Sequence, residues 1–394
     1  MQLIRTVKIK LDADVKQIQP IVSAFTTAFN FICKESFDNK IYNDIKLHKL
    51  TYRKVINYLP SNLAISARAK ALEAVKSVNS LVKKKNKNKN KKKVYVATCP
   101  KSKNCAVRLN KKNAYTLNFK KKTVSIISLK GKRKEYSLNI PAYYKEYFED
   151  NSWVNGSADL LIKNNAVYLH ISFKKDMPTP PISDKVLGID RGINNIAVTS
   201  DGKFYTGKKV KEVSYRYRTL REILRKVNTK SAKRHLKKLS GKEKRFKADT
   251  NHNIAKEIVD SLNFGDIIVL EDLEGIRDSS DKLRKPIRIL VNTWNFYQLE
   301  QYLTYKGMTK GIQVIHVSAK NTSITCSKCG HIHKGNRKDQ CHFECKVCGY
   351  RLNADLNASR NIRNRAMERE KRSNGADVNQ PIVTTEMLVA SPVL

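Results

Sequence analysis

The spacing of hydrophobic residues changes several times along this chain, and each change predicts a different kind of structure. Residues 1–12 alternate hydrophobic and polar side chains, which predicts one strand. Over residues 14–82 the hydrophobic residues recur every three to four positions, which predicts helices. A period of two then returns in short runs bounded by Lys, Asn and Gly, at residues 94–96, 106–109, 114–119, 123–129, 136–140 and 166–173. These runs predict a small antiparallel barrel or sandwich. The strand at 1–12 can join this sheet, which makes the helical block an insertion.

The second half of the chain begins after a proline-rich break at residues 177–181. Its pattern predicts strands at 186–191, 194–199 and 203–206, helices at 208–247 and 250–263, a strand at 266–272, a helix at 291–306, a strand at 312–317 and a helix from 353. Two segments lack a hydrophobic period. Residues 83–93 contain eight lysines and nothing apolar, so we expect a solvated loop or an arm that contacts phosphates. Residues 370–394 predict a loose tail.

The charge balance indicates the kind of partner. Lys and Arg number 78 against 35 Asp and Glu, which gives a formal net charge of +43 in 394 residues. This excess favours a polyanion, either nucleic acid or an anionic membrane. No apolar stretch approaches the ~18 residues of a membrane span, and the N-terminus lacks the apolar block of a signal peptide. We therefore expect a cytoplasmic, nucleoid-associated protein with no membrane partner.

Many of the basic residues fall in one predicted helix. Residues 208–247 contain 17 Lys or Arg and three Glu. A stripe that packs on the domain is predicted by residues at helical spacing, namely Val213, Tyr217, Leu220, Leu224 and Val227. The remaining faces are cationic, and phosphate contact there would make binding depend steeply on salt.

Three acidic residues stand where predicted elements begin or end. Asp190 and Glu271 lie near the ends of two hydrophobic strands, and Asp355 follows Asn353, a candidate cap of the last helix. If the fourth strand pairs beside the first, these acids can converge, with Asp190 as the bridging ligand. Mg²⁺ prefers carboxylate oxygens, and two Mg²⁺ ions about 3.5–4 Å apart support phosphodiester cleavage. Each acid alone fits a solvated strand-end or cap residue, but the three contexts together favour a magnesium site.

Four cysteines between the second and third acids have the spacing of a zinc ribbon. Two Cys-x2-Cys pairs are separated by 15 residues, and their members are Cys326, Cys329, Cys345 and Cys348. A glycine follows each second cysteine, where a tight turn needs a permissive backbone. Four thiolates close a tetrahedral site and leave no open position, so we expect one structural Zn²⁺.

Three strands, then alternating helices and strands, with acids on the first strand, the fourth strand and the last helix, match an α/β RNase H-like architecture. Residues 186–365 resemble the transposon-encoded TnpB (OrfB-type) proteins and, more distantly, the compact type V CRISPR effectors. The matching segments are Gly188-Ile-Asp-Arg-Gly192, Val269-Leu-Glu-Asp-Leu273, Thr325-Cys-Ser-Lys-Cys-Gly330, Phe343-Glu-Cys-Lys-Val-Cys-Gly349 and Asn353-Ala-Asp-Leu-Asn-Ala358.

The resemblance implies an RNA-guided endonuclease that cuts double-stranded DNA beside a short adjacent motif, with a guide RNA derived from the transposon end. It implies that Asp190, Glu271 and Asp355 are a RuvC triad that holds two Mg²⁺ ions, with Mn²⁺ as an alternative, and that the four cysteines bind zinc. The implied domains are a β-barrel (wedge) domain, a helical recognition domain with the lysine-rich loop, a RuvC nuclease domain, the inserted zinc ribbon and a flexible tail. Their residues are, in that order, 1–12 with 94–180, 13–93, 186–321 with 351–369, 322–350, and 370–394.

Two rival functions share this fold and charge. A catalytically idle, RNA-guided DNA-binding regulator would have no need of the three acids, all of which are present. A guide-independent RNase H-like resolvase or transposase would recognise DNA ends or junctions without RNA. The large N-terminal half and the excess of positive charge favour an RNA partner. The guide sequence, the adjacent motif and the oligomeric state stay open.

Overall fold

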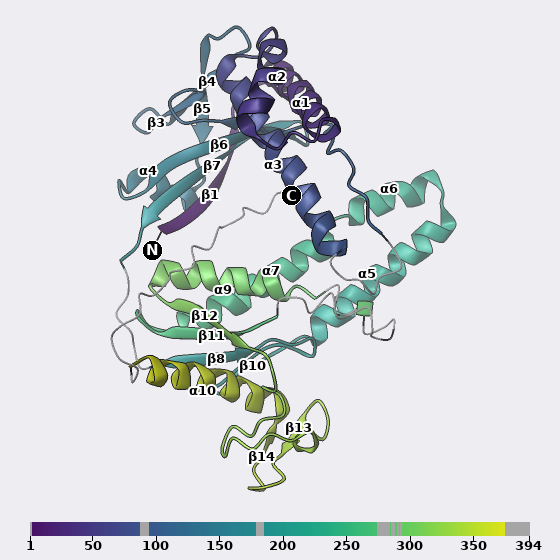
Figure 1. Cartoon of the computed structure of the whole chain (residues 1–394), viewed down its shortest axis with the longest axis vertical. Coiled ribbons are helices and arrows are strands. Elements are labelled where there is room, and N and C mark those ends of the chain that lie inside the picture. The colour runs from purple at the N-terminus through teal and green to yellow at the C-terminus, as the bar shows by residue number, and fades with distance from the viewer. Residues whose placement is uncertain are drawn as a thin grey trace. The chain divides into compact units, whose positions relative to one another are not determined.

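The computed structural model describes residues 2–86, 94–178, 185–273, 284, 288–289, 291 and 294–374, and for the last helix it describes side chains as far as residue 368. The chain divides into two compact units, Met1–Asp176 and Met177–Leu394, whose elements are labelled in Figure 1. Residues 87–93 of the predicted lysine-rich loop and residues 375–394 of the predicted tail lie outside the described residues.

Three helices are inserted between the first two strands of the N-terminal unit. Strand β1 (Gln2–Leu11) is followed by α1 (Val15–Asp38), α2 (Asp44–Ile56) and α3 (Ser61–Asn86). Helix α1 begins after Asp14, whose carboxylate accepts a hydrogen bond from the N–H of Lys16 at 2.9 Å. The hydrophobic positions of α1 that the helical period selects are buried, namely Ile18, Ile21, Val22, Phe25, Phe29 and Ile32.

The strands of this unit form one antiparallel sheet that curls towards closure. Its further strands are β2 (Val107–Leu109), β3 (Tyr115–Asn118), β4 (Thr123–Ile127), β5 (Arg133–Asn139), β6 (Val154–Lys163) and β7 (Ala166–Asp176), with η1 (Ala142–Tyr144) and α4 (Glu146–Glu149) between β5 and β6. The order is β2-β6-β7-β1-β5-β4-β3, so the N-terminal strand lies in the middle of the sheet. Tyr115 on the edge strand β3 donates a hydrogen bond to the carbonyl of Gly156 on β6, which brings the two ends of the sheet together in a nearly closed barrel.

Two details of the predicted strand pattern are wrong. Residues 94–96 form no strand, and the side chains of Val94 and Val96 are 76% and 81% exposed. Strand β6 was not predicted, because the pairing of β6 with β7 shifts register between Asn155 and Ala158. The extra residues interrupt the alternation from which a strand is recognised.

The sheet of the C-terminal unit places the predicted first and fourth strands side by side. Its strands are β8 (Val186–Asp190), β9 (Asn195–Thr199), β10 (Phe204–Thr206), β11 (Ile267–Asp272) and β12 (Gln313–Ser318). Their order is β10-β9-β8-β11-β12, and β8 pairs with β11 in parallel, as the RNase H-like pattern predicts. Residues 267–270 are buried on both faces of the sheet, which is why they form a continuous apolar run.

Helices cover both faces of this sheet (Figure 1). They are α5 (Lys208–Val227), α6 (Lys230–Leu239), α7 (Lys242–Asp260), α9 (Phe296–Lys310) and α10 (Ala354–Asn374). Residues of α7 and α9 share one hydrophobic cluster with β8, β9 and β11. Helix α10 contributes Ile362 and Ala366 to a second cluster, together with Ile267, Val269 and Val317 of the sheet.

The single basic helix predicted at 208–247 is wrong, since the structure has three helices there. Asn228 adopts a left-handed conformation (φ 50°) that ends α5, and the Thr229 side chain caps α6. Gly241 is also left-handed (φ 76°) and precedes α7. The helix predicted at 250–263 is the C-terminal part of α7, which ends at Asp260. The predicted stripe on α5 is only half-buried, and its last residue, Val227, is wrongly predicted to pack because it is 55% exposed. The part of α5–α6 that faces solvent carries most of the cations.

The zinc-ribbon segment lies between β12 and α10. It contains η3 (Lys334–Asn336) and the antiparallel pair β13 (His342–Glu344) and β14 (Arg351–Asn353), and β14 runs directly into α10. Within the described parts of the chain, none of the helices has the length and apolar character needed to span a membrane.

Candidate functional site

Two of the three predicted acids lie side by side at the ends of parallel strands. Asp190 is the last residue of β8, and Glu271 follows Leu270, which pairs with Ile189. Parallel strands end at the same edge of a sheet, so both carboxylates emerge there. Asp190 is half-buried, and Glu271 is only 9% exposed. Asp272, the next residue, is exposed, as expected for a side chain on the opposite face of the strand.

The third acid comes from α10, which crosses close to β8. Asn353 caps this helix, because its side-chain oxygen accepts hydrogen bonds from the N–H groups of Asp355 (3.0 Å) and Leu356 (3.2 Å). Asp355 therefore lies in the first turn, as the sequence predicts. A Cβ placed on Gly188 of β8 would lie 2.2 Å from the backbone oxygen of Ser359, so glycine permits this close approach.

The charges of the other two acids act on Asp190. The pKa of Asp190 is raised from 3.8 to about 8, chiefly by desolvation and further by the fields of Glu271 and Asp355. Arg337 and Arg191 oppose this rise without cancelling it. Carboxylate oxygens are the donors that a hard divalent cation such as Mg²⁺ prefers. Among the described residues, however, only the four cysteines form a group whose ligand atoms all lie within 4.8 Å of one another.

Glu271 is held by groups from two other segments. The hydroxyl of Thr322, which precedes the ribbon cysteines, donates a hydrogen bond to Glu271 Oε1. Desolvation raises the pKa of Glu271, while the Thr322 hydrogen bond and the Arg191 charge act to lower it. Arg191 is 4% exposed and donates to the backbone oxygen of Glu271 at 2.6 Å and to Glu300 Oε2 at 2.6 Å. The strand end that bears Glu271 is therefore tied to α9.

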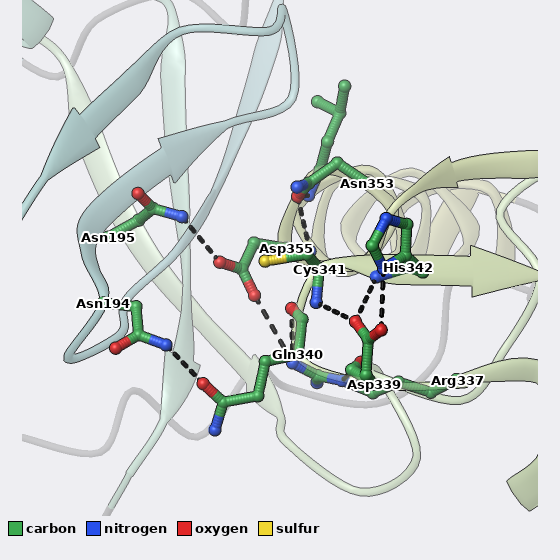
Figure 2. Close-up of polar contacts among 10 residues, drawn as sticks. Asn194, Asn195, Arg337, Asp339, Gln340, Cys341, His342, Asn353 and Asp355 are labelled. Atoms are coloured by element: carbon green, nitrogen blue, oxygen red, sulfur yellow. Dashed lines mark hydrogen bonds and ion pairs between the residues drawn. The ribbon is translucent and has the colours of Figure 1, made fainter.

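Asp355 is held between the sheet of the C-terminal unit and the cysteine-containing segment, as Figure 2 shows. Asn195 of β9 donates to Asp355 Oδ2 at 2.8 Å. From the other side, Arg337 of the ribbon lies 3.4 Å from Oδ1. The neighbouring Gln340 accepts a hydrogen bond from Asn194, so the ribbon loop docks on the turn between β8 and β9.

The four predicted cysteines form one cluster. Their Sγ atoms all lie within 4.8 Å of one another, and the pairs Cys326–Cys348 and Cys329–Cys345 are 3.7 and 3.6 Å apart. Four sulfurs bound tetrahedrally to one Zn²⁺ at about 2.3 Å lie about 3.8 Å apart, so this spacing fits structural zinc. Gly330 and Gly349 have φ values of +77° and +65°, as their turns require.

A row of asparagines fixes the ribbon to α10. Asn357 and Asn361 are 0% and 4% exposed. The Asn357 amide donates to the carbonyl of Thr325 at 2.8 Å, and its oxygen accepts from the N–H of Ser327 at 3.0 Å. Asn361 donates to the carbonyl of Thr322 at 2.8 Å. These hydrogen bonds hold the first cysteine pair against the helix that carries Asp355.

Two family models match the chain. The model described as "Probable transposase" matches residues 170–274, which contain Asp190 and Glu271. The model described as "Cas12f1-like, TNB domain" matches residues 296–362, which contain the four cysteines and Asp355.

Curated relatives match parts of the chain. The TnpB-like protein MJ0751 of Methanocaldococcus jannaschii is 29% identical over 259 residues, which are 62% of this chain and 91% of that protein. The chain is thus similar to a TnpB-like protein over most of that protein's length. A CRISPR-associated endodeoxyribonuclease Cas12f1 of Sulfoacidibacillus thermotolerans is 40% identical over 129 residues, which cover 32% of this chain but only 29% of that relative. The resemblance to TnpB proteins and to compact type V effectors is confirmed.

A solved structure has a similar fold. The cryo-EM structure of a Cas12f1-sgRNA-target DNA complex aligns with a TM-score of 0.60 over 88% of this chain and 80% of that chain, at 17% sequence identity. At this identity the likeness is one of fold, and it includes residues of both units of the chain.

The sequence identified the acids and cysteines of this chain but not the residues that orient them. Arg337, Thr322 and Asn195 each contact an acid that lies between 18 and 160 positions away along the chain. The predicted cap at Asn353 was the one orienting contact visible in the sequence, because capping is local.

Proposed function

We propose that this TnpB-family chain is an RNA-guided DNA endonuclease of a transposable element, and that Asp190, Glu271 and Asp355 are its RuvC triad. The observation that carries the proposal is the convergence of Glu271 and Asp355 on Asp190, whose pKa their fields help to raise to about 8. Structural roles alone would not favour three like charges at the meeting point of two strands and a helix.

The chain's own residues supply positioning for phosphodiester hydrolysis. Asp190, Glu271 and Asp355 would be the residues that hold the two Mg²⁺ ions. When bound, two such ions activate an attacking water and stabilise the leaving oxygen. Hydrogen bonds from Thr322 and Asn195 hold the Glu271 and Asp355 carboxylates in one orientation. The three acids are therefore ordered before substrate arrives.

Arg337 brings a positive charge from the ribbon to the same place. Its guanidinium lies 3.4 Å from Asp355 and also acts on Asp190. A guanidinium beside the acids can approach a phosphate oxygen of the substrate and stabilise charge that develops on it. In this proposal the zinc is structural, and its task is to hold Arg337 and Thr322 in position.

The guide RNA and target DNA are proposed as partners on separate grounds. The net charge of +43 demands extensive phosphate contact. The Cas12f1 structure with a similar fold is described as a complex with sgRNA and target DNA. We infer that the barrel at 1–12 and 94–180 and the helical insertion at 13–93 hold a guide–target heteroduplex, next to a short adjacent motif in the DNA. The guide would derive from the transposon end.

The test begins with the RNA that co-purifies when the protein is expressed beside its flanking DNA. One discrete RNA that ends in variable sequence is expected, and it supplies the guide for a cleavage assay with Mg²⁺. Asp190→Ala should abolish cutting and keep RNA and DNA binding. Asp272→Ala, an exposed acid on the same strand end, should cut normally. Cleavage by Asp190→Ala, or only bulk RNA that salt removes, would contradict the proposal.

A further inference from the structure

A cavity of about 380 Å³ lies in the C-terminal unit, next to the turn that follows Asp190. Its lining comes from the turn after β8, from α5, α7 and α9, and from residues that precede α9. This volume falls in the range of roughly 300–1,000 Å³ that is usual for small-ligand pockets. Ile193, on its wall, follows the catalytic Asp190 almost directly in the chain.

The inner wall of this cavity is apolar and aromatic. Ile196 and Leu299 are 8% and 1% exposed and form its deep part. Trp294 and Phe296 are half-buried in the wall, with ring centres 4.9 Å apart. The guanidinium of Arg191, which holds the end of β11, lies 5.9 Å from the centre of the Phe296 ring. One aromatic wall of the cavity therefore adjoins the acid-bearing strand end.

The outer rim carries positive charge. Tyr215 is 63% exposed, and the Arg218 guanidinium lies 5.4 Å from the centre of its ring. The one acid in the lining, Glu243, is already paired with Arg221 at 2.6 Å and with Lys247 at 2.9 Å. Glu243 therefore does not neutralise the charge of Arg218 at the mouth of the cavity.

We propose that this cavity binds a single unstacked nucleobase of the DNA strand that is being cut. An aromatic, apolar interior with a cationic rim matches a base with its attached phosphate, because the base can stack on Trp294 or Phe296 while the phosphate meets Arg218. A base that is paired and stacked in a duplex cannot enter, so the occupant is single-stranded or flipped out of its helix. Seating it there would bring the strand to the edge of the sheet where β8 ends, next to the turn that follows Asp190. The inference rests on the proposed nuclease function.

The chain has two tryptophans, Trp153 and Trp294, which permits a direct optical test. In the full chain carrying Trp153→Phe and Asp190→Ala, Trp294 is the single indole reporter and the DNA stays uncut. We expect single-stranded oligothymidylate to quench Trp294 emission to a saturating level as it binds. A strand of equal length built from abasic residues should bind by fluorescence anisotropy and leave the emission unchanged, since it has no base to stack.

Affinity provides the second readout. Stacking on an aromatic side chain is worth about tenfold or more in binding, so Trp294→Ala should weaken oligothymidylate binding by that factor while leaving the abasic strand unaffected. Trp294→Phe should restore most of the loss and shows whether the cavity still folds. Tyr297→Ala, which removes an exposed ring of α9 outside the cavity lining, is the matched control and should bind normally.

Equal quenching by both strands, or binding of oligothymidylate without quenching, would overturn the pocket assignment and leave the proposed nuclease intact. Failure of the protein to bind any strand would overturn both. Loss of guided cutting with normal Trp294 quenching would count against the nuclease alone.

Discussion

Gly188 of β8 packs against the backbone of Ser359 in α10. An added Cβ would lie 2.2 Å from the Ser359 oxygen and 2.6 Å from the Arg363 nitrogen. Since β8 ends in Asp190 and α10 begins beside Asp355, this contact sets the distance between the first and third acids.

Gly188→Ala should push α10 away from β8, because the obstructing atoms are backbone and cannot rotate aside. We expect a loss of about 1–3 kcal/mol in the free energy of unfolding, as is usual for overpacking, and a near-complete loss of cutting. Thermal melting and guided cleavage measure the two effects. Gly202→Ala is the control: its φ of +98° strains alanine but its Cβ meets nothing within 4 Å, so it should cost stability alone. Full activity in Gly188→Ala would show that the helix position does not matter.

The raised pKa of Asp190 predicts how stability depends on pH when magnesium is withheld. Between the ordinary value of 3.8 and about 8, the folded state holds a proton on Asp190 that the unfolded state has released. The free energy of unfolding therefore falls as pH rises through this window, and this contribution levels off above about 8. Asp190→Asn should lack the trend in melting experiments over the neutral part of the window. An identical slope in both proteins would assign the trend to other groups.

Arg337→Ala should slow cutting by about 10²–10³-fold, as expected for removal of one charged group that stabilises developing charge. Zinc content and DNA binding should not change, because the four cysteines are untouched. Single-turnover cleavage with saturating guide and target measures the effect. Lys338→Ala is the matched control, since this neighbouring cation pairs with Glu344 instead of an acid of the triad. Equal losses in the two variants would indicate a general effect of loop charge.

Loss of zinc should loosen residues 322–350 and stop cutting as a consequence. Thr322 and Arg337 contact Glu271 and Asp355, so an unfolded ribbon removes one orienting contact from each acid. Hydrogen exchange and cleavage on a Cys345→Ser variant measure the two effects. Cys341→Ser, an exposed cysteine outside the sulfur cluster, should retain zinc, protection and activity. Cutting that survives a disordered ribbon would separate the zinc from the acids.

The sequence by itself determined the features that depend on neighbours in the chain. Asp190 and Glu271 follow hydrophobic runs, the cysteine spacing matches one Zn²⁺, and Asn353 caps the helix of Asp355, all through short-range geometry. The break at Asn228 and Gly241 was equally local, yet the helical spacing of the hydrophobic residues continued across it and concealed it.

Tertiary structure decided which groups orient the acids. Asn195 and Asp355 are 160 positions apart, and Arg191 reaches Glu300 across 109 positions. No periodicity or spacing encodes such pairs, because they exist only after β8, β11 and α10 pack together. The cavity beside Trp294 has the same origin, since four separate segments must close around it before it can hold a ligand. Local propensities choose the elements, whereas long-range packing places the side chains that do the chemistry.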